Sequence, residues 1–169
     1  MNKRLIVNKR FDEKLIINKN YNPYTRVPKS WRELRQIIVY TYDELGAGTE
    51  QKPIDFNDID ISNIDSFYNV NMNIGIFVRT DFEYIDISKW DVSNVKDMTY
   101  MFFNCWKLKS VGDLSNWNVS KVEDMSYMFR KCYNLKSVGD LSNWNISNLK
   151  DMSNMFEGSA ITNIPDWYE

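Results

Sequence analysis

The stretch WNVSKVEDMSYMF, residues 117–129, decides the fold of this chain, because nearly the same phrase stands 27 residues before it and 27 residues after it. The three copies begin at Trp90, Trp117 and Trp144. Comparison of residues 90–116 with residues 117–143 gives 19 identical positions out of 27. Self-similarity at a fixed period of this size is typical of repeat proteins, in which each unit buries its apolar side by stacking on its neighbours.

The repeats continue on both sides of these two units. The third unit is shorter and reaches the next tryptophan, Trp167, after 23 residues, which is typical of a terminal cap. A less regular unit, at about residues 59–89, precedes the unit that begins at Trp90. We therefore predict a repeat array over residues 54–169, with units of about 59–89, 90–116, 117–143 and 144–167, preceded by a basic segment over residues 1–29 and a helix over residues 30–46.

Within a unit the apolar residues fall at almost every third position, which suits neither a long amphipathic helix nor an alternating strand. This pattern predicts an α/β solenoid, with one short strand at about 109–114 and one short helix at about 123–131 in each unit. We expect the core to consist of a set of residues and their repeat mates: Leu108, Val111, Leu114, Trp117, Val122, Met125 and Met128.

The segment before the repeats predicts a capping helix. Ser30 and Glu33 stand at capping-box spacing, and Gly46 suits a helix end. We expect this helix to cover the open N-terminal edge of the repeats with one apolar stripe: Trp31, Leu34, Ile38 and Leu45. Further upstream, residues 4–8 and 14–18 could pair as a β-hairpin.

The phrases WDVSNVKDMTYMFFNC (residues 90–105) and LKSVGDLSNW (residues 108–117) resemble the BspA-type leucine-rich-repeat family, the bacterial surface-protein repeat of about 26 residues. The resemblance covers residues 59–167, and residues 27–46 resemble the helical leader of such arrays. It implies a leucine-rich-repeat solenoid used for binding, commonly on cell surfaces, with no catalytic residues. The first unit departs from the pattern, since residues 67–77 lack the Met-x-x-Met-Phe-x-x-Cys core.

Several residue types that enzymes and metal sites need are missing. The chain has no histidine and only 6 glycines, so it offers no Ser-His-Asp triad and no glycine-rich phosphate loop. The acidic residues 55–65 do not match a calcium loop, because Asp60 stands where glycine is needed, and we assign them to turns. Cys105 and Cys132 share one repeat position and are predicted to be buried thiols without a disulfide partner. We therefore expect a protein without catalysis, metal or cofactor.

Charge is divided unevenly along the chain. Residues 1–35 hold ten basic and three acidic side chains, whereas residues 36–169 hold 11 basic and 20 acidic ones. The basic segment could bind nucleic acid, a ribonucleoprotein or an acidic surface; alternatively, it lies against the acidic repeats or is simply solvated. The candidate residues for the first interpretation are Lys3, Arg4, Lys9, Arg10, Arg32 and Arg35.

Positions that differ between otherwise near-identical units are free of scaffold constraints, so a protein partner is expected to meet them. They include residue types that dominate interfaces: Phe103, Trp106, Arg130, Lys131 and Tyr133. The alternative that Trp106 and Tyr133 pack against the next coil stays open.

The sequence thus favours a non-catalytic protein-binding leucine-rich-repeat module, such as a cytoplasmic adaptor or an inhibitor from an AT-rich bacterium or its phage that blocks a target by covering its surface. A nucleic-acid binder and a fragment of a bacterial surface adhesin are the alternatives. The N-terminal apolar run is too short for a signal peptide, and no run of 18 apolar residues could span a membrane. These features predict a cytoplasmic location if the chain is complete, and the cell surface if it is a trimmed piece.

Overall fold

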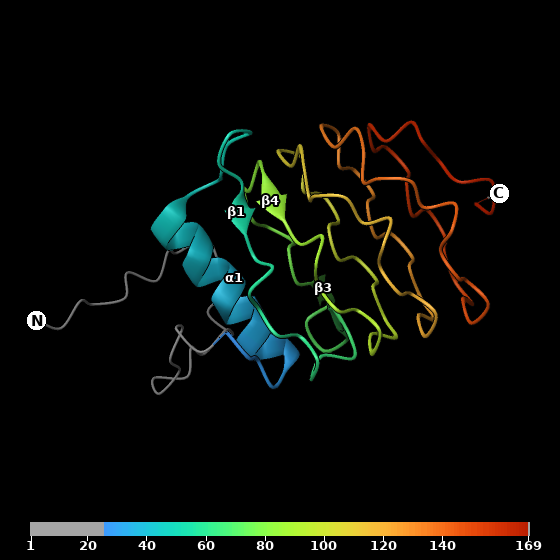
Figure 1. The fold of residues 1–169 in the computed structure, drawn as a ribbon, viewed down its shortest axis with the longest axis horizontal. Helices are drawn as coiled ribbons and strands as arrows, with labels where there is room; N and C mark the ends of the chain where they lie inside the picture. The colour runs from blue at the N-terminus through green and yellow to red at the C-terminus, as the bar shows by residue number, and fades with distance from the viewer. Residues whose placement is uncertain (1–25, 169) are drawn as a thin grey trace, which may run out of the picture.

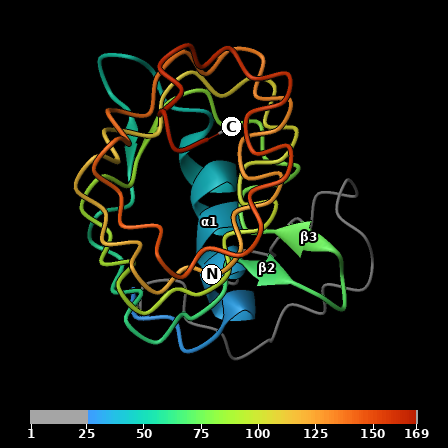
Figure 2. The same cartoon turned by 90° about the vertical axis from the view of Figure 1, so that its right-hand side faces the viewer.

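The computed structural model describes residues 26–168. Helix α1 (Trp31–Leu45) is followed by successive coils that stack along one axis, and α1 lies at the N-terminal end of the stack (Figure 1). Along that axis the coils surround a common interior (Figure 2). Strand β1 (Ile54–Asp55) pairs in parallel with β4 (Ile85–Asp86), and β2 (Tyr68–Asn69) pairs antiparallel with β3 (Ile74–Gly75).

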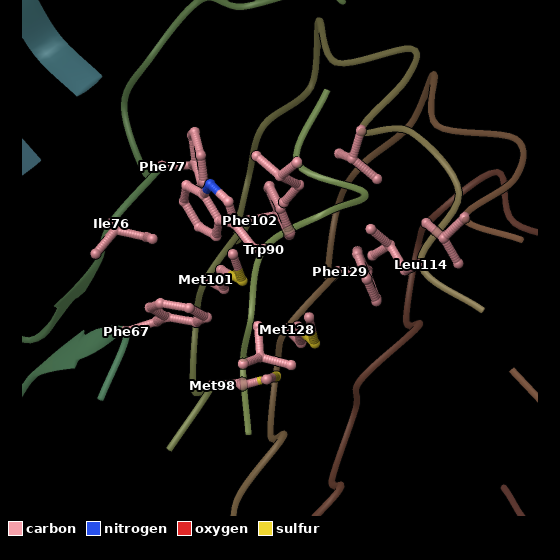
Figure 3. Close-up of a cluster of buried hydrophobic side chains, with 14 of the residues drawn as sticks. Phe67, Ile76, Phe77, Trp90, Met98, Met101, Phe102, Leu114, Met128 and Phe129 are labelled. Atoms are coloured by element: carbon pink, nitrogen blue, oxygen red, sulfur yellow. The ribbon is translucent and has the colours of Figure 1, made fainter. Parts of the chain in front are cut away.

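Equivalent residues of adjacent units lie side by side. Asp124 forms parallel bridges with both Asp97 and Asp151, so each unit of 27 residues makes one coil. Aromatic rings stack in the same way: the centroids of Phe102 and Phe129 are 5.4 Å apart, with planes 6° from parallel (Figure 3). The seven residues named for the core are buried, which confirms the interior predicted from the apolar pattern: Leu108, Val111, Leu114, Trp117, Val122, Met125 and Met128. Among their repeat mates, Leu149 and Met152 in the last coil are partly exposed, so the prediction is wrong for those two.

The short helix expected at about 123–131 is absent, and these residues form consecutive turns. Every second amide in this segment donates to the next coil. The amide of Met125 donates to the carbonyl of Asp151 at 2.8 Å, and the amide of Phe129 donates to the carbonyl of Met155 at 2.9 Å. A helix would need those same amides for its own carbonyls. The strand expected at 109–114 is likewise reduced to a single bridge between Ser110 and Tyr84.

A tryptophan opens each unit because its indole joins two coils. The Nε1 atom of Trp90 donates to the carbonyl of Phe56 at 2.8 Å, and that of Trp144 donates to the carbonyl of Leu114 at 3.1 Å. The buried ring thus has a partner for its one polar atom. Phenylalanine could fill the space but could not form this bond.

The aspartates of the repeats form turns, as the sequence predicts. Oδ1 of Asp113 accepts from the amide of Ser115 at 3.0 Å, and Oδ1 of Asp140 accepts from that of Ser142 at 3.0 Å. Asparagine does the same at Asn118. A carboxylate or amide oxygen that accepts a hydrogen bond two residues ahead fixes a sharp corner, so these residues set where each coil bends.

Helix α1 begins and ends at the expected residues. Oγ of Ser30 accepts from the amide of Glu33 at 3.3 Å, and Gly46 follows the helix with a φ of 78°. The Glu33 carboxylate accepts from the amide of Lys29 at 2.9 Å, where a standard capping box would use the amide of Ser30. The sequence therefore located the helix but not the second bond of its cap.

The buried face of α1 differs from the predicted stripe at one end. Leu34 and Ile38 are fully buried and belong to the core, which they share with Ile37. Leu45 is 66% exposed, so the prediction that it packs on the repeats is wrong. It stands at the last helical residue, just before Gly46 turns the chain away.

Arg35 is fully buried between α1 and the first coil. Its guanidinium donates to the carbonyls of Ile76 and Val78, the latter at 2.6 Å. Burial lowers its pKa to about 10, so it remains a cation at neutral pH. Arg35 thus holds α1 against the coils through two backbone acceptors.

The first coil carries a β-hairpin in place of the usual turns. Strands β2 and β3 project to one side of the stack (Figure 2). Val70, between them, is 75% exposed. A Cβ at Gly75 would lie 2.1 Å from the carbonyl oxygen of Tyr100, so only glycine allows the hairpin to pack on the next coil. The hairpin expected over residues 4–18 lies outside the described residues.

Candidate docking face

The structure separates the predicted partner-binding residues into two groups. Phe103, Arg130 and Lys131 precede the buried cysteine of their coil, whereas Trp106 and Tyr133 directly follow it. Because Cys105 and Cys132 point into the core, the chain turns inward between the groups. The first group joins further aromatic side chains that the sequence analysis did not select.

Three tyrosines from three coils form a continuous row. The ring centroids of Tyr68 and Tyr100 are 5.7 Å apart, and those of Tyr100 and Tyr127 are 4.8 Å apart with planes 9° from parallel. The ring of Phe103 meets that of Tyr100 edge-on at 5.1 Å, and the guanidinium of Arg130 lies 5.3 Å from the Tyr127 centroid. All five side chains are half-buried, and we call them the aromatic row.

Two members of the row have a strained backbone. Tyr100 and Tyr127 have φ values of 55° and 59°, and their repeat mate Asn154 has 55°. A left-handed conformation costs a residue with a side chain on the order of 1–2 kcal/mol, and asparagine tolerates it better than tyrosine. An aromatic pair returns about 0.5–1.5 kcal/mol. The ring contacts of the row thus offset the strain, and strain retained at a surface is typical of functional positions.

Arg130 is fixed in place by the following coil. Its Nη2 and Nε atoms lie 3.0 Å and 2.9 Å from the two carboxylate oxygens of Glu157. The Nη2 contact is a hydrogen bond and the Nε contact adds charge attraction, and together they keep the guanidinium near the ring of Tyr127. Lys131, the next residue, is half-buried and has a φ of 62°.

The hydroxyl group of Tyr100 lies in a partly buried setting. Burial, followed by the neighbouring Tyr127 and Tyr68, raises the pKa of Tyr100 above its ordinary value. The hydroxyl of Tyr68 donates to Oδ1 of Asn73 at 2.7 Å, which ties the row to the projecting hairpin. The row therefore offers ring surface and hydroxyl groups beside a hairpin whose tip carries exposed Val70.

The second group lies on the surface. Trp106 and Tyr133 are 49% and 56% exposed, which favours a role on the surface over packing against the next coil. The ammonium of Lys107 lies 4.9 Å from the Trp106 ring centroid. Exposed aromatic rings of this size are the residues that most often dominate protein interfaces.

Of the predicted basic residues, only Arg32 and Arg35 lie among the described ones. Arg32 is exposed on α1. The prediction that Arg35 meets an acidic surface is wrong, since its guanidinium is buried on two backbone carbonyls. The remaining predicted residues lie outside the described part of the chain: Lys3, Arg4, Lys9 and Arg10.

The chain that enters α1 is bound to the acidic first coil. The guanidinium of Arg26 pairs with Asp58, and the carbonyl of Arg26 accepts from the amide of Asp60 at 2.8 Å. At Arg26, these contacts favour the interpretation in which the basic segment lies against the repeats.

The two cysteines are buried free thiols, as predicted. Sγ of Cys132 donates to the carbonyl of Phe102 at 3.1 Å, and Sγ of Cys105 donates to that of Phe77 at 3.3 Å. Burial raises the pKa of Cys132 to about 12 and that of Cys105 well above its ordinary value. Both thiols are therefore poor nucleophiles.

The constant Lys-Ser-Val-Gly-Asp segments line an open, shallow depression of about 360 Å³. Gly139 has a φ of 91°, and a Cβ there would lie 1.9 Å from Oδ1 of Asp113. Nearby, Nζ of Lys109 pairs with Glu83 of the preceding coil at 2.7 Å. These contacts explain the constancy of the segment through coil stacking.

Tyr100 and Tyr127 were not among the predicted residues, because both full units have tyrosine there and identity between units predicts a scaffold position. Asn154 in the third unit was the available signal. Asparagine at a repeat position marks a left-handed backbone more often than it marks a core contact. A tyrosine at the same position is then the unexpected residue.

Within residues 26–168, no helix has the length and apolar character of a membrane span. Comparison with curated proteins and with solved structures gave no match. A family model matches residues 48–167, which include all the coils that bear the aromatic row. The chain therefore belongs to the family described as Mycoplasma protein of unknown function, DUF285.

Proposed function

We propose that this protein is a non-catalytic protein-binding module and that its partner docks on the aromatic row. The observation that carries the proposal is the pair of stacked, half-exposed tyrosines held in a left-handed backbone at Tyr100 and Tyr127. Tyrosine is strained at a position where the third unit has asparagine, and strain kept at a surface is typical of positions selected for contact with another molecule.

The surroundings of the row support a protein partner. Tyrosine and arginine are enriched among residues that contribute most to interfaces, and stacking already restricts these side chains, so binding costs little further entropy. Residues 36–169 have an excess of nine acidic side chains over basic ones, 20 against 11, which favours a partner with a basic surface. We further propose that the stacked coils are a solenoid of the leucine-rich-repeat kind, with adaptor and inhibitor as the roles that suit it.

The test uses substitutions that the fold already tolerates. Changing Tyr100 and Tyr127 together to Asn copies the residue present at Asn154 and relieves the backbone strain. We expect this variant to fold and to lose its partner, with an affinity at least tenfold weaker. The matched control changes Lys109 and Lys136 together to Ala, which alters the constant segments.

Partners are captured from a lysate of the source cell with the unaltered protein, identified, purified and titrated against both variants by calorimetry. Loss of affinity in the tyrosine variant and retention in the lysine variant supports the proposal. The opposite result would place the partner on the constant segments and refute it.

Catalysis has no support from the geometry. Among the described residues, no group of three or more potential metal ligands comes together, and several of the aspartates accept hydrogen bonds in turns. A nucleic-acid role would depend on the basic segment, of which Arg26 and Arg35 already bond to the fold.

A further inference from the structure

The turns of the repeats align their peptide groups in columns along the stack. The amide of Phe77 donates to the carbonyl of Met101, the amide of Phe102 to that of Met128, and the amide of Phe129 to that of Met155, at 2.9–3.1 Å. Each acceptor carbonyl and the next donor amide belong to one peptide group. The hydrogen bonds therefore form a head-to-tail chain in which every amide points toward the C-terminal end.

One such column begins at Arg35. The carbonyl of Ile76, which shares a peptide group with the amide of Phe77, accepts from the buried guanidinium. Aligned peptides accumulate negative partial charge at the carbonyl end and positive partial charge at the amide end. The cation thus closes the negative end of the column, whereas the positive end emerges on the last coil.

The last coil presents four amides in this direction. In the preceding coil the amides of residues 125, 127, 129 and 131 each donate to the next coil at 2.8–3.0 Å. Their repeat mates have no carbonyl acceptor within residues 26–168. These four amides, which we call the donor edge, belong to Met152, Asn154, Phe156 and Gly158.

Three apolar side chains beside the donor edge are also uncovered. Ile146, Leu149 and Met152 are partly exposed. Their repeat mates in the preceding coil, Val119, Val122 and Met125, are at most 1% exposed. The other side of the end is closed, because Tyr168 meets Phe156 edge-on at 5.0 Å and Trp167 stacks on Trp144 at 6.4 Å. Uncovered apolar groups and unbonded donors therefore lie together on one half of the end.

We infer that the donor edge is a docking site for a coil of the same repeat type in a partner protein. An ordinary β-strand edge alternates amides and carbonyls, whereas this edge presents amides at every second residue. Between coils of this chain, such amides donate to a coil whose carbonyls are presented at every second residue. The carbonyls of residues 124, 126, 128 and 130 are an example.

A second copy of this chain does not supply that complement. Helix α1 covers the N-terminal end of the stack, where free carbonyls would otherwise face outward (Figure 1). Two C-terminal ends brought together would place donors against donors. A second copy is therefore not the occupant. The donor edge adjoins the C-terminal end of the aromatic row, since Asn154 is the repeat mate of Tyr127 and Glu157 pairs with Arg130.

The experiment uses the full chain labelled with ¹⁵N and a synthetic peptide of residues 117–143, which carries the acceptor carbonyls. We expect the amides of the donor edge to exchange hydrogen rapidly and their mates in the preceding coil slowly. We also expect saturable shifts at the donor edge when the peptide is added, and none with a scrambled peptide. Slow exchange at all four amides, or equal shifts with the scrambled peptide, would overturn the inference.

Two substitutions sharpen the test. Leu149→Glu places a charge beside the donor edge and should weaken peptide binding at least tenfold, whereas Val70→Glu at the hairpin tip should leave it unchanged. The amide spectrum shows whether each variant folds, and Met152→Glu replaces the first variant if it does not. Unchanged binding in the folded variant, or dimerisation of the unaltered chain through this end, refutes the proposed occupant.

Discussion

Replacing Arg35 with Met should strongly destabilise the protein, although it removes a charge from the core. The two carbonyls that accept from the guanidinium, those of Ile76 and Val78, would remain buried without a donor. An unsatisfied buried acceptor costs about 1–3 kcal/mol, and removal of one partner of a buried charged contact costs about 3–5 kcal/mol. Relief of the desolvated charge offsets part of this, so we expect a loss of about 2–5 kcal/mol in the free energy of unfolding.

Urea unfolding followed by tryptophan fluorescence measures this loss. The matched control is Arg32→Met, which changes an exposed arginine of the same helix and should alter the free energy of unfolding by less than about 0.5 kcal/mol. If Arg35→Met is as stable as the unaltered protein, the cation contributes nothing to joining α1 to the coils. The account of Arg35 as the end of an amide column would then be refuted.

Three further outcomes are expected. Tyr127→Asn should change the free energy of unfolding by less than about 1 kcal/mol, because the lost stacking and the relieved strain are similar, whereas Met128→Ala should cost about 2–5 kcal/mol through a cavity. Cys105 and Cys132 should resist alkylation in the folded protein and react after unfolding, since burial raises the pKa of both thiols. Stability to urea should fall as the pH drops below about 4, because the hydroxyl and amide of Ser142 hold the pKa of Asp140 below its unfolded value, and Asp140→Asn should reduce that fall.

The sign of the acid effect follows from linkage. A carboxyl group whose pKa is lower in the folded state stabilises the fold above its unfolded pKa, and this contribution is lost as protons bind at lower pH. The variant keeps a turn-forming amide oxygen, as at Asn118. A pH dependence as steep in the variant as in the unaltered protein would contradict this account. Rapid alkylation of the folded thiols, or a large loss of stability in Tyr127→Asn, would contradict the other two.

The interior could be predicted from the sequence because burial repeats with the same period as the residues. Met125 and Leu114 recur at fixed spacing and must meet their mates if the units stack at all. The ends of α1 could also be predicted, since Ser30 and Gly46 act locally. The secondary structure inside each coil could not, because it depends on hydrogen bonds between residues of different coils, such as Met125 and Asp151, which are far apart in the sequence.

The false helix shows why local patterns were insufficient. Asp124 suits the first turn of a helix, but it also suits a turn in which Oδ1 accepts from the amide of Ser126, and the structure uses the second. Arg35 was misassigned for a related reason. Its charge is visible in the sequence, whereas the carbonyls of Ile76 and Val78 that draw it inward are brought near only by folding.

The uniform bonding between coils also bears on how such a protein changes its length. Residues 90–116 and 117–143 are interchangeable along the stack, because equivalent amides of the two units, such as those of Phe102 and Phe129, donate to the next coil in the same register. Duplication of 27 codons would add one coil without disturbing the helix at one end or the aromatic closure at the other. The same event would add one more tyrosine to the row. Gene duplication within the array can therefore extend the aromatic row in whole steps, with each intermediate still able to fold.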